Sequence, residues 1–314
     1  MNLKALPSVK AEPQIHEPVF LIGMPRSGTT LLFSVLAAHP ELAWFSQYLE
    51  RAPGRPAVAA LSRVVDRAPA LRKSVDRHGE RRSRIGKLRI APDEAYAVWE
   101  RCCGERFRYD YLLGARASAA ERSCARDIVA KVMRYQGKPR FAAKITGPAR
   151  IGYLSSIFDD ARFVHIVRDG RAVVDSLMRV PFWKDSHRMR EPAWSGGLSD
   201  DALGEWRARG ESAPELAAMQ WRAVLETARE EAAAIEPERY TEVRYEDFVS
   251  DPHDVLDQIT EFCDLPRKRG PHAFIDERVE IRNLNDRWRE GPNAAEIERL
   301  SALLEEPLRE HGYE

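Results

Sequence analysis

Arginine, serine and threonine side chains gather at a short glycine-bounded turn near the N-terminus. Residues 18–22 are a run of strand-forming residues, and residues 23–30 read Gly-Met-Pro-Arg-Ser-Gly-Thr-Thr. Apolar residues at helical spacing follow directly. A strand, a tight turn and a helix in this order can surround an anion with backbone N–H groups and a helix N-terminus. The residues that we expect to line this site are Arg26, Ser27, Gly28, Thr29 and Thr30.

The cation of this turn stands at an unusual position. Nucleotide triphosphatases place a lysine after the last glycine of the turn, where it reaches the β- and γ-phosphates. Here Thr29 occupies that position, and the cation is Arg26, inside the turn. A planar guanidinium can bind two anion oxygens without a metal ion. We therefore expect an anion site without ordinary ATP chemistry; the alternative interpretation is a plain turn capped by Ser27 or Thr29.

A second arginine follows a second apolar strand. Residues 163–167 deliver Arg168 to the strand end where open α/β sheets bind ligands. Ser176 lies eight residues later, about two helical turns on. Arginine and serine together can hold a phosphate monoester by charge-assisted hydrogen bonds. The alternative interpretation is that Arg168 pairs with a neighbouring acid and Ser176 is an ordinary helix residue.

The elements that must position these residues alternate between strand and helix. Strand patterns cover residues 18–22, 140–144, 162–167 and 240–245, and helical patterns cover 29–38, 149–158, 170–179, 214–235 and 252–263. Such alternation predicts an α/β fold with three layers and a mostly parallel sheet. We expect an irregular loop over residues 181–212.

The remaining segments suggest how the chain is organised. Residues 1–17 read as a loose leader, and residues 50–138 as an arginine-rich helical insertion or cap with amphipathic pieces at 57–65 and 94–103. We predict a single domain over residues 1–314, because neither a repeat nor a low-complexity tract divides the chain.

Composition limits the classes of function. The 49 basic residues balance the 49 acidic residues, which argues against general attraction to nucleic acid or membrane surfaces. No signal peptide is evident, and the apolar runs are shorter than the ~20 residues of a membrane helix. Four cysteines show no metal-binding spacing, so we predict reduced cysteines, no metal and a cytoplasmic location.

Residues 25–30 and 168–176 together resemble the two binding signatures for 3′-phosphoadenosine 5′-phosphosulfate (PAPS) in sulfotransferases. The resemblance is to tyrosylprotein sulfotransferases and their bacterial relatives, and it extends over residues 19–49, 141–180 and 243–248. It implies a P-loop-like domain in which the first turn holds the 5′-phosphosulfate. It also implies that Arg168 and Ser176 hold the 3′-phosphate.

The same resemblance implies roles for residues outside the two signatures. Tyr245 is expected beside the nucleotide, and Arg287 is expected in a C-terminal segment that covers the nucleotide, at the place of a family lysine. Lys144, which ends the strand pattern at 140–144, matches the lysine that acts on the leaving group. The catalytic cations implied are therefore Arg26 and Lys144; the alternative for Lys144 is a solvated surface residue.

The general base departs from the family pattern. Tyrosylprotein sulfotransferases carry a glutamate soon after the first helix, and this position is Gln47 here, whose amide is no base at neutral pH. Glu50 lies three residues further on and shares a face with Gln47 in a helix. His187 is a second candidate, because other sulfotransferase branches use histidine. We predict Glu50 as the base, with His187 as the alternative; each can also be read as an ordinary surface residue.

The predicted function is PAPS-dependent sulfuryl transfer to a hydroxyl, with release of adenosine 3′,5′-bisphosphate (PAP). Gln47 favours a carbohydrate or small-molecule acceptor over protein tyrosine. Two alternatives remain. One is a small-molecule kinase using ATP and magnesium, with Asp169 as the metal ligand; the other is a PAPS- or PAP-binding protein without turnover.

Overall fold

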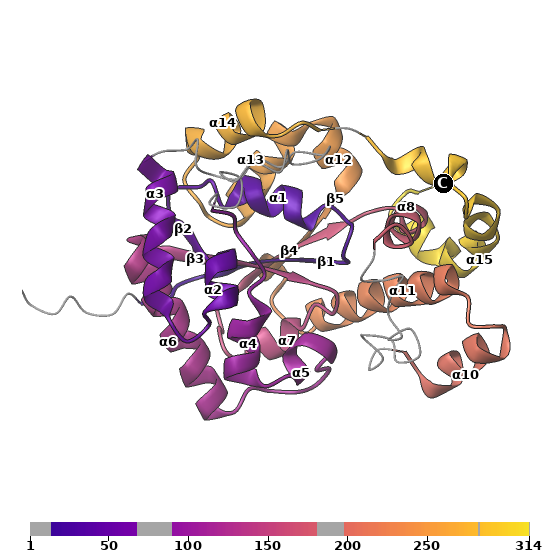
Figure 1. The fold of residues 1–314 in the computed structure, drawn as a ribbon, viewed down its shortest axis with the longest axis horizontal. Helices are drawn as coiled ribbons and strands as arrows, with labels where there is room; N and C mark the ends of the chain where they lie inside the picture. Colours follow the sequence, from indigo (N-terminus) through magenta and orange to yellow (C-terminus); the bar gives the residue numbers. More distant parts are fainter. Residues whose placement is uncertain (1–13, 68–89, 181–197, 282, 314) are drawn as a thin grey trace, which may run out of the picture.

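A computed structural model describes residues 14–67, 90–180, 198–281 and 283–313. In the described residues, five parallel strands form one sheet in the order β2-β3-β1-β4-β5 (Figure 1). The strands are β1 (Val19–Gly23), β2 (Leu42–Trp44), β3 (Arg140–Thr146), β4 (Arg162–Val167) and β5 (Tyr240–Arg244). Their buried, apolar character is typical of a parallel sheet covered on both faces, and the predicted fold class is confirmed.

One face of the sheet is covered by helices from both ends of the chain (Figure 1). These are α1 (Thr29–Leu36), α12 (Tyr245–Ser250), α13 (Pro252–Phe262) and α14 (Arg269–Arg278). Phe33 of α1, Leu256 of α13 and Phe274 of α14 share a buried cluster with Val164 of β4. The amphipathic pattern of residues 252–263 thus produces a layer helix, as predicted.

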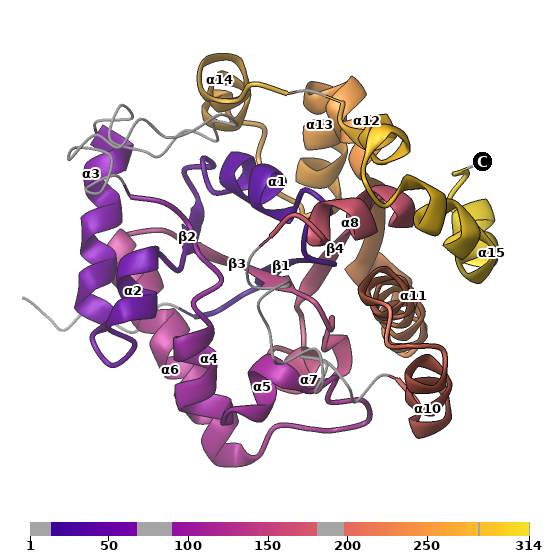
Figure 2. The ribbon, with the colours of Figure 1, turned by 45° about the vertical axis from the view of Figure 1, so that its right-hand side comes forward.

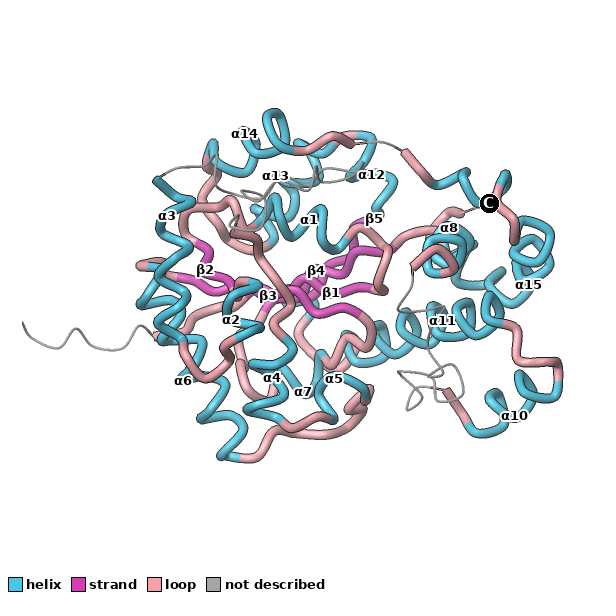
Figure 3. The backbone as a smooth tube through the Cα atoms, in the orientation of Figure 1, coloured by secondary structure: helices cyan, strands magenta, loops and turns pink. Residues whose placement is uncertain are grey.

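The opposite face is covered by helices that lie mostly in the segment predicted as an insertion or cap (Figures 1 and 3). The elements following β2 are α2 (Gln47–Arg51), η1 (Pro56–Leu61), α3 (Ser62–Arg67), α4 (Tyr96–Cys103), α5 (Arg106–Tyr109), α6 (Ala119–Gln136) and, after β3, α7 (Ile151–Ser155). Trp99 and Phe107 stack on each other and share a core with Phe20 and Phe141 of the sheet. The described part of this segment is therefore one layer of the domain.

A third group of helices packs beside β4 and β5 (Figure 2). It contains α8 (Gly170–Leu177), α10 (Asp200–Ala208), α11 (Ala213–Ala232) and α15 (Ala294–Glu310), with the short helices η6 (Pro237–Arg239) and η7 (Asn285–Glu290). The helix α10 corrects the loop predicted over residues 181–212. Ser199 caps it by accepting a hydrogen bond from the backbone N–H of Ala202, and Trp206 is buried. Residues 181–197 lie outside the described part.

The N-terminal segment is packed where its description begins. Ile15 is buried, and Glu17 forms an ion pair of 2.5 Å with Arg162. The carbonyl of Glu17 also accepts a hydrogen bond from Arg140 at 2.6 Å. The end of the predicted leader is therefore attached to the first residues of β3 and β4.

A disulfide joins Cys102 of α4 to Cys124 of α6, whereas Cys103 and Cys263 are free and buried. The prediction of reduced cysteines is wrong for this pair. The two residues are 22 positions apart, and only the packing of α4 on α6 reveals that they meet. No helix within the described ranges is both long and apolar enough to span a bilayer.

Candidate active site

The predicted site residues meet because the strands that carry them are parallel. β1 ends at Gly23, β3 at Thr146, β4 at Val167 and β5 at Arg244, so the segments that follow all emerge at one edge of the sheet (Figure 2). We call this the carboxyl edge. The first turn, Arg168 and Tyr245 follow three of these strand ends, as expected for a ligand site of an open α/β sheet.

The first turn presents backbone groups rather than side-chain caps. Arg26 and Gly28 both have left-handed backbone conformations, with φ of 75° and 91°. Gly28 is the N-cap residue of α1, no side chain caps this helix, and its first turn has no acidic residue. The N–H groups of the first turn of α1 therefore remain available to an anion. The predicted alternative, a turn capped by Ser27 or Thr29, is not what forms.

The two arginine motifs are in direct contact. Arg26 Nε donates to Ser176 Oγ at 2.9 Å, and Arg168 Nη1 donates to the carbonyl of Arg26 at 2.9 Å. Among the residues that the structure describes, no carboxylate lies within ion-pair distance of either guanidinium. Loss of solvation and then the charge of Arg168 lower the pKa of Arg26. Two adjacent cations without a neutralising acid favour an anion with more than one charge.

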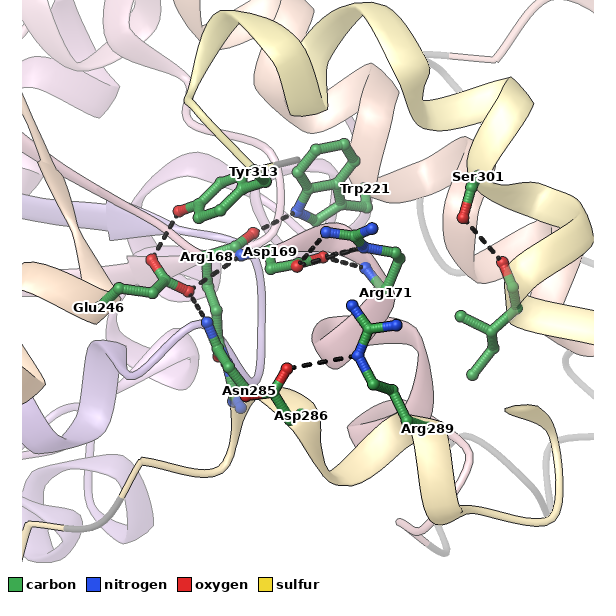
Figure 4. Close-up of polar contacts among 11 residues, drawn as sticks. Arg168, Asp169, Arg171, Trp221, Glu246, Asn285, Asp286, Arg289, Ser301 and Tyr313 are labelled. Carbon is green, nitrogen blue, oxygen red and sulfur yellow. Dashed lines mark hydrogen bonds and ion pairs between the residues drawn. The ribbon is translucent and has the colours of Figure 1, made fainter. Parts of the chain in front are cut away.

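Arg168 is buried beneath the C-terminal segment (Figure 4). Its Nε donates to Asn285 Oδ1 at 2.9 Å, and its guanidinium carbon lies 4.4 Å from the centroid of the Tyr245 ring. Burial lowers the pKa of Arg168, and the partial negative charge of Tyr245 is the first effect that opposes it. Glu246 accepts hydrogen bonds from Asn285 and, at 2.7 Å, from Tyr313. The start of η7 is thus held directly over the second arginine.

The structure places Tyr245 against the first turn and Arg287 at an exposed position of η7. Tyr245 begins α12 rather than ending β5, and a Cβ added at Gly28 would meet its ring at 2.4 Å. Its ring therefore lies against the turn. Arg287 is on η7 and is exposed.

Asp169, which the kinase alternative needs as a magnesium ligand, is already occupied. Its carboxylate accepts from the backbone N–H of Arg171 at 2.8 Å and from that guanidinium at 2.8–3.2 Å (Figure 4). Asp169 is the N-cap of α8. The described residues contain no group of three or more potential metal ligands.

Lys144 lies within β3, two residues before the strand ends at Thr146. Its side chain is 8% exposed, so the interpretation as a solvated surface residue is wrong. Lys144 Nζ donates to Thr30 Oγ1 at 2.9 Å and lies 3.3 Å from Glu94 Oε1. The ammonium group is therefore held between the start of α1 and a carboxylate.

Glu94 is the residue of this cluster that sequence reasoning missed. It precedes α4, in the stretch of residues 50–138 where we found no motif. Its Oε1 accepts from Thr146 Oγ1 at 2.6 Å, which ties it to the end of β3. The contact depends on tertiary packing across 52 residues, and no local pattern signals it.

Of the residues considered for the base, Gln47 and Glu50 hold backbone groups on either side of Glu94. Gln47 Oε1 accepts from the N–H of Ala91 at 2.8 Å. Glu50 Oε2 accepts from the N–H of Ala97 at 2.9 Å, and Glu50 Oε1 lies 3.7 Å from Arg108. Both side chains thus bind structural partners near α4. His187 lies outside the described residues.

Comparisons with known proteins identify the family of the chain. The profile described as "Sulfotransferase family" matches residues 18–269. Protein-tyrosine sulfotransferase 2 of Gallus gallus is 27% identical over 163 residues, which cover 51% of this chain and 33% of that protein. Protein-tyrosine sulfotransferase of Drosophila melanogaster is 23% identical over 248 residues, which cover 79% of this chain and 38% of that protein. The chain thus spans little more than a third of these relatives.

A solved structure shows the same fold. Sulfotransferase STF9 from Mycobacterium avium superposes with a TM-score of 0.60 over 94% of this chain and 77% of that chain, at 18% identity. The family profile covers most of the domain, including both arginine motifs, Lys144 and Tyr245. The chain therefore belongs to the sulfotransferase family, a family of enzymes whose sulfuryl donor is PAPS.

Proposed function

We propose that this chain transfers a sulfuryl group from PAPS to an acceptor hydroxyl and releases PAP. The observation that carries this proposal is the contact between Arg26 and Arg168, which are 142 residues apart in the sequence. Neither forms an ion pair with an acid in the described residues; Arg168 is buried, where a charge is normally paired, whereas Arg26 is exposed. A nucleotide with a 5′-phosphosulfate and a 3′-phosphate supplies an anion for each of them.

The residues present fit such a nucleotide. The uncapped start of α1 and the two unneutralised guanidinium groups supply donors without a metal ion. The proposed nucleotide-binding residues are Arg26, Ser27, Gly28, Thr29, Thr30, Arg168, Ser176, Tyr245 and Arg287. In this assignment the first turn holds the 5′-phosphosulfate, and Arg168 with Ser176 holds the 3′-phosphate.

The chain's own cations would stabilise the charge that develops during transfer. Bound PAPS supplies a sulfuryl group joined to a phosphate oxygen, which becomes negative as that bond breaks. We assign Lys144 and Arg26 to this charge, since a positioned cation in a dry site stabilises a transition state strongly. Thr30 orients Lys144 through its hydroxyl. The sequence predicts Glu50 as the base.

A carbohydrate or a small molecule is the acceptor that we propose. Gln47 stands where tyrosylprotein sulfotransferases place a glutamate, which distinguishes this chain from them. The names of the relatives favour a second candidate, a tyrosine side chain in a protein. A cytoplasmic location also stays a prediction.

The test measures transfer from labelled PAPS to sugars, phenols, aliphatic alcohols and a tyrosine peptide. It is paired with thermal shifts for PAP and for ATP with magnesium, because a ligand that binds only the native state raises its melting temperature. Transfer together with a shift for PAP supports the proposal. A shift for PAP without transfer to any acceptor would indicate a binding protein, and a shift for ATP alone would indicate a kinase.

Substitution of Arg168 by lysine tests which phosphate this residue binds. Lysine keeps the charge but loses the planar fork, so PAP affinity should fall at least tenfold. Adenosine 5′-monophosphate has no 3′-phosphate, and its affinity should change less than threefold. Arg179→Lys is the matched control, because Arg179 lies just after α8 and is paired with Asp175. Equal losses for both nucleotides would contradict the assignment.

A further inference from the structure

We propose that Glu94 is the general base of the transfer reaction, an inference that rests on the proposed function. Oε1 of Glu94 lies 3.3 Å from Nζ of Lys144, the cation assigned to the leaving group. A base must lie within reach of both the acceptor hydroxyl and the transferring group. Of the carboxylates in the described residues, only Glu94 forms an ion pair with Lys144.

The segment that carries Glu94 is attached to the carboxyl edge by backbone pairing. The N–H of Asp93 donates to the carbonyl of Phe45 at 2.8 Å, and Ser46 forms a bridge with Pro92. The N–H of Gln47 donates to the carbonyl of Ala91. These contacts fix residues 91–93 against the end of β2.

Gln47 therefore has a defined place in this arrangement. Its side-chain oxygen accepts from the N–H of Ala91 at 2.8 Å, in addition to the backbone contact between the same two residues. The residue at the position of the family glutamate thus fastens the segment that presents Glu94. The carboxylate is supplied from a different segment, three residues beyond Ala91.

The Glu94 carboxylate is fixed by one oxygen only. Oε1 accepts from Thr146 Oγ1 at 2.6 Å and faces Lys144. The hydroxyl of Tyr96, two residues on, donates to the carbonyl of Thr146 at 2.6 Å, which adds a second attachment. Within the described ranges, Oε2 has no hydrogen-bonding partner. The Glu94 side chain is 26% exposed, so an acceptor can reach it.

This geometry defines where the proton and electrons go. The acceptor oxygen forms a bond to sulfur, and the bond between sulfur and the phosphate oxygen breaks. The electron pair of that bond stays on the phosphate oxygen, near Lys144. The acceptor's hydroxyl proton moves to Oε2 of Glu94. The negative charge of the leaving oxygen thus develops next to Lys144, and the proton is received by Glu94. Both groups are in position before the reaction.

Glu50 is the rival carboxylate, and its contacts favour a structural role. Its Oε2 accepts from Ala97 at the start of α4, and its Oε1 lies 3.7 Å from Arg108. A carboxylate that accepts a hydrogen bond from the first turn of a helix stabilises that end of the helix. We therefore assign the base to Glu94 and a structural role at the start of α4 to Glu50.

The kinetic test compares Glu94→Gln with Glu50→Gln, using the acceptor that the panel selects. Loss of a general base costs about 100-fold or more, so kcat/KM of Glu94→Gln should fall by that amount and lose its acidic limb. Its affinity for PAP should change less than threefold. The exposed Glu105→Gln serves as the matched control. If Glu50→Gln loses the acidic limb while Glu94→Gln keeps it, Glu50 is the base and the proposal is overturned.

A spectroscopic titration tests the same assignment without turnover. The carboxyl ¹³C signal that disappears in Glu94→Gln should titrate at the pH of the acidic limb of kcat/KM, because that limb reports the free enzyme. A midpoint more than one pH unit away would overturn the proposal. A purely positioning role would leave the acidic limb in Glu94→Gln, since glutamine can still accept the hydrogen bond from Thr146. A wild-type protein that neither binds PAP nor transfers would instead refute the proposed function.

Discussion

Lys144 shows how this chain can supply a fixed charge at the carboxyl edge. Its ammonium group is almost fully removed from water, and its described contacts are one hydroxyl and one carboxylate. Burying such a group is unfavourable unless its donors are satisfied. Thr30 and Glu94 satisfy two of them, which holds Nζ in place before any ligand binds. A cation that need not reorganise is the most effective stabiliser of developing charge.

Substitution Lys144→Met should therefore act on the chemical step rather than on nucleotide affinity. The negative charge of the leaving oxygen is largest in the transition state, so we expect kcat to fall about 100-fold or more. The Kd for PAP should change less than threefold. Lys131→Met, on the outer surface of α6 and paired with Asp127, is the control for losing a lysine. A parallel loss of PAP affinity would assign Lys144 to binding instead.

The residues that the sequence identifies are those in compact motifs. Arg26, Arg168 and Lys144 each follow or end an apolar strand, so their types and positions predict a shared edge. Glu94 belongs to no such pattern, and the pairing of Gln47 with Ala91 is one of the tertiary contacts that place it beside Lys144. That pairing joins residues 44 positions apart. Local periodicity contains no information about it, so the sequence left the base undecided.

At the scale of elements, the junction of β1 and α1 shapes the proposed nucleotide site. Gly28 combines a left-handed backbone with close contact to the Tyr245 ring. It thereby lets α12 approach α1 while the first N–H groups of α1 stay open. Both requirements exclude a side chain at this position.

Replacing Gly28 by alanine should damage both stability and binding. The new Cβ would meet the Tyr245 ring at 2.4 Å and 2.9 Å, in addition to the cost of a positive φ. We expect a loss of roughly 2–4 kcal/mol in unfolding free energy, and a loss of PAP binding of at least tenfold. Gly114→Ala is the matched control, because Gly114 also has a positive φ but nothing within 4 Å. Urea unfolding that shows equal losses for both variants would contradict the proposed contact.

Helix α7 depends on a carboxylate from α11. Glu231 Oε2 accepts from the N–H of Ile151 at 3.0 Å, and its Oε1 accepts from Gly152 at 3.1 Å. Burial raises the pKa of Glu231 to about 7, although both N–H groups and then Arg150 oppose the shift. Between pH 4.5 and about 7, Glu231 therefore keeps a proton in the folded protein that it releases in the unfolded chain. The associated stability is fully present below a pH of about 4.5 and is lost as the pH rises through 7.

Glu231→Gln should remove this dependence on pH. Glutamine cannot ionise but retains an oxygen that accepts a hydrogen bond. The unfolding free energy of the Glu231→Gln variant, relative to that of the wild type, should thus increase between pH 4.5 and pH 8 by at most about 3 kcal/mol. Glu226→Gln, on the surface of the same helix, should show no such trend. Parallel urea-derived curves for wild type and Glu231→Gln would refute the assignment.

Prediction of the elements succeeded where a run is long or strongly apolar. The strands at β1, β3, β4 and β5 and the helix α11 were all indicated by the sequence. The strand β2 was missed because three residues, Leu42–Trp44, give no alternation to read. The helix α10 was missed because tryptophan, glycine and charged residues around it indicate a loop, whereas buried Leu203 and Trp206 fold it. Tertiary packing decides both cases.

At the scale of the whole molecule, the layer beneath the sheet links the proposed base to the core. Helix α4 starts two residues after Glu94, and its middle contributes Trp99 to the cluster that contains Phe20 of β1. Its last turn is joined to α6 by the disulfide between Cys102 and Cys124. The proposed nucleotide-binding residues instead lie on the first turn and α1, on Arg168 and α8, and on the segment after β5. Glu94 is thus held mainly by the layer of α4 and α6, whereas the proposed nucleotide-binding residues are held by other elements.

Removing the disulfide should consequently affect stability and turnover more than nucleotide binding. Closing a loop of 22 residues stabilises the folded state by about 3 kcal/mol in the chain-entropy description. The double variant C102S/C124S should lose about that much unfolding free energy, while its Kd for PAP stays within threefold. Reductant should destabilise the wild type but leave the double variant unchanged, which is the internal control. A PAP affinity that falls together with stability would show that both halves of the site depend on the α4–α6 layer.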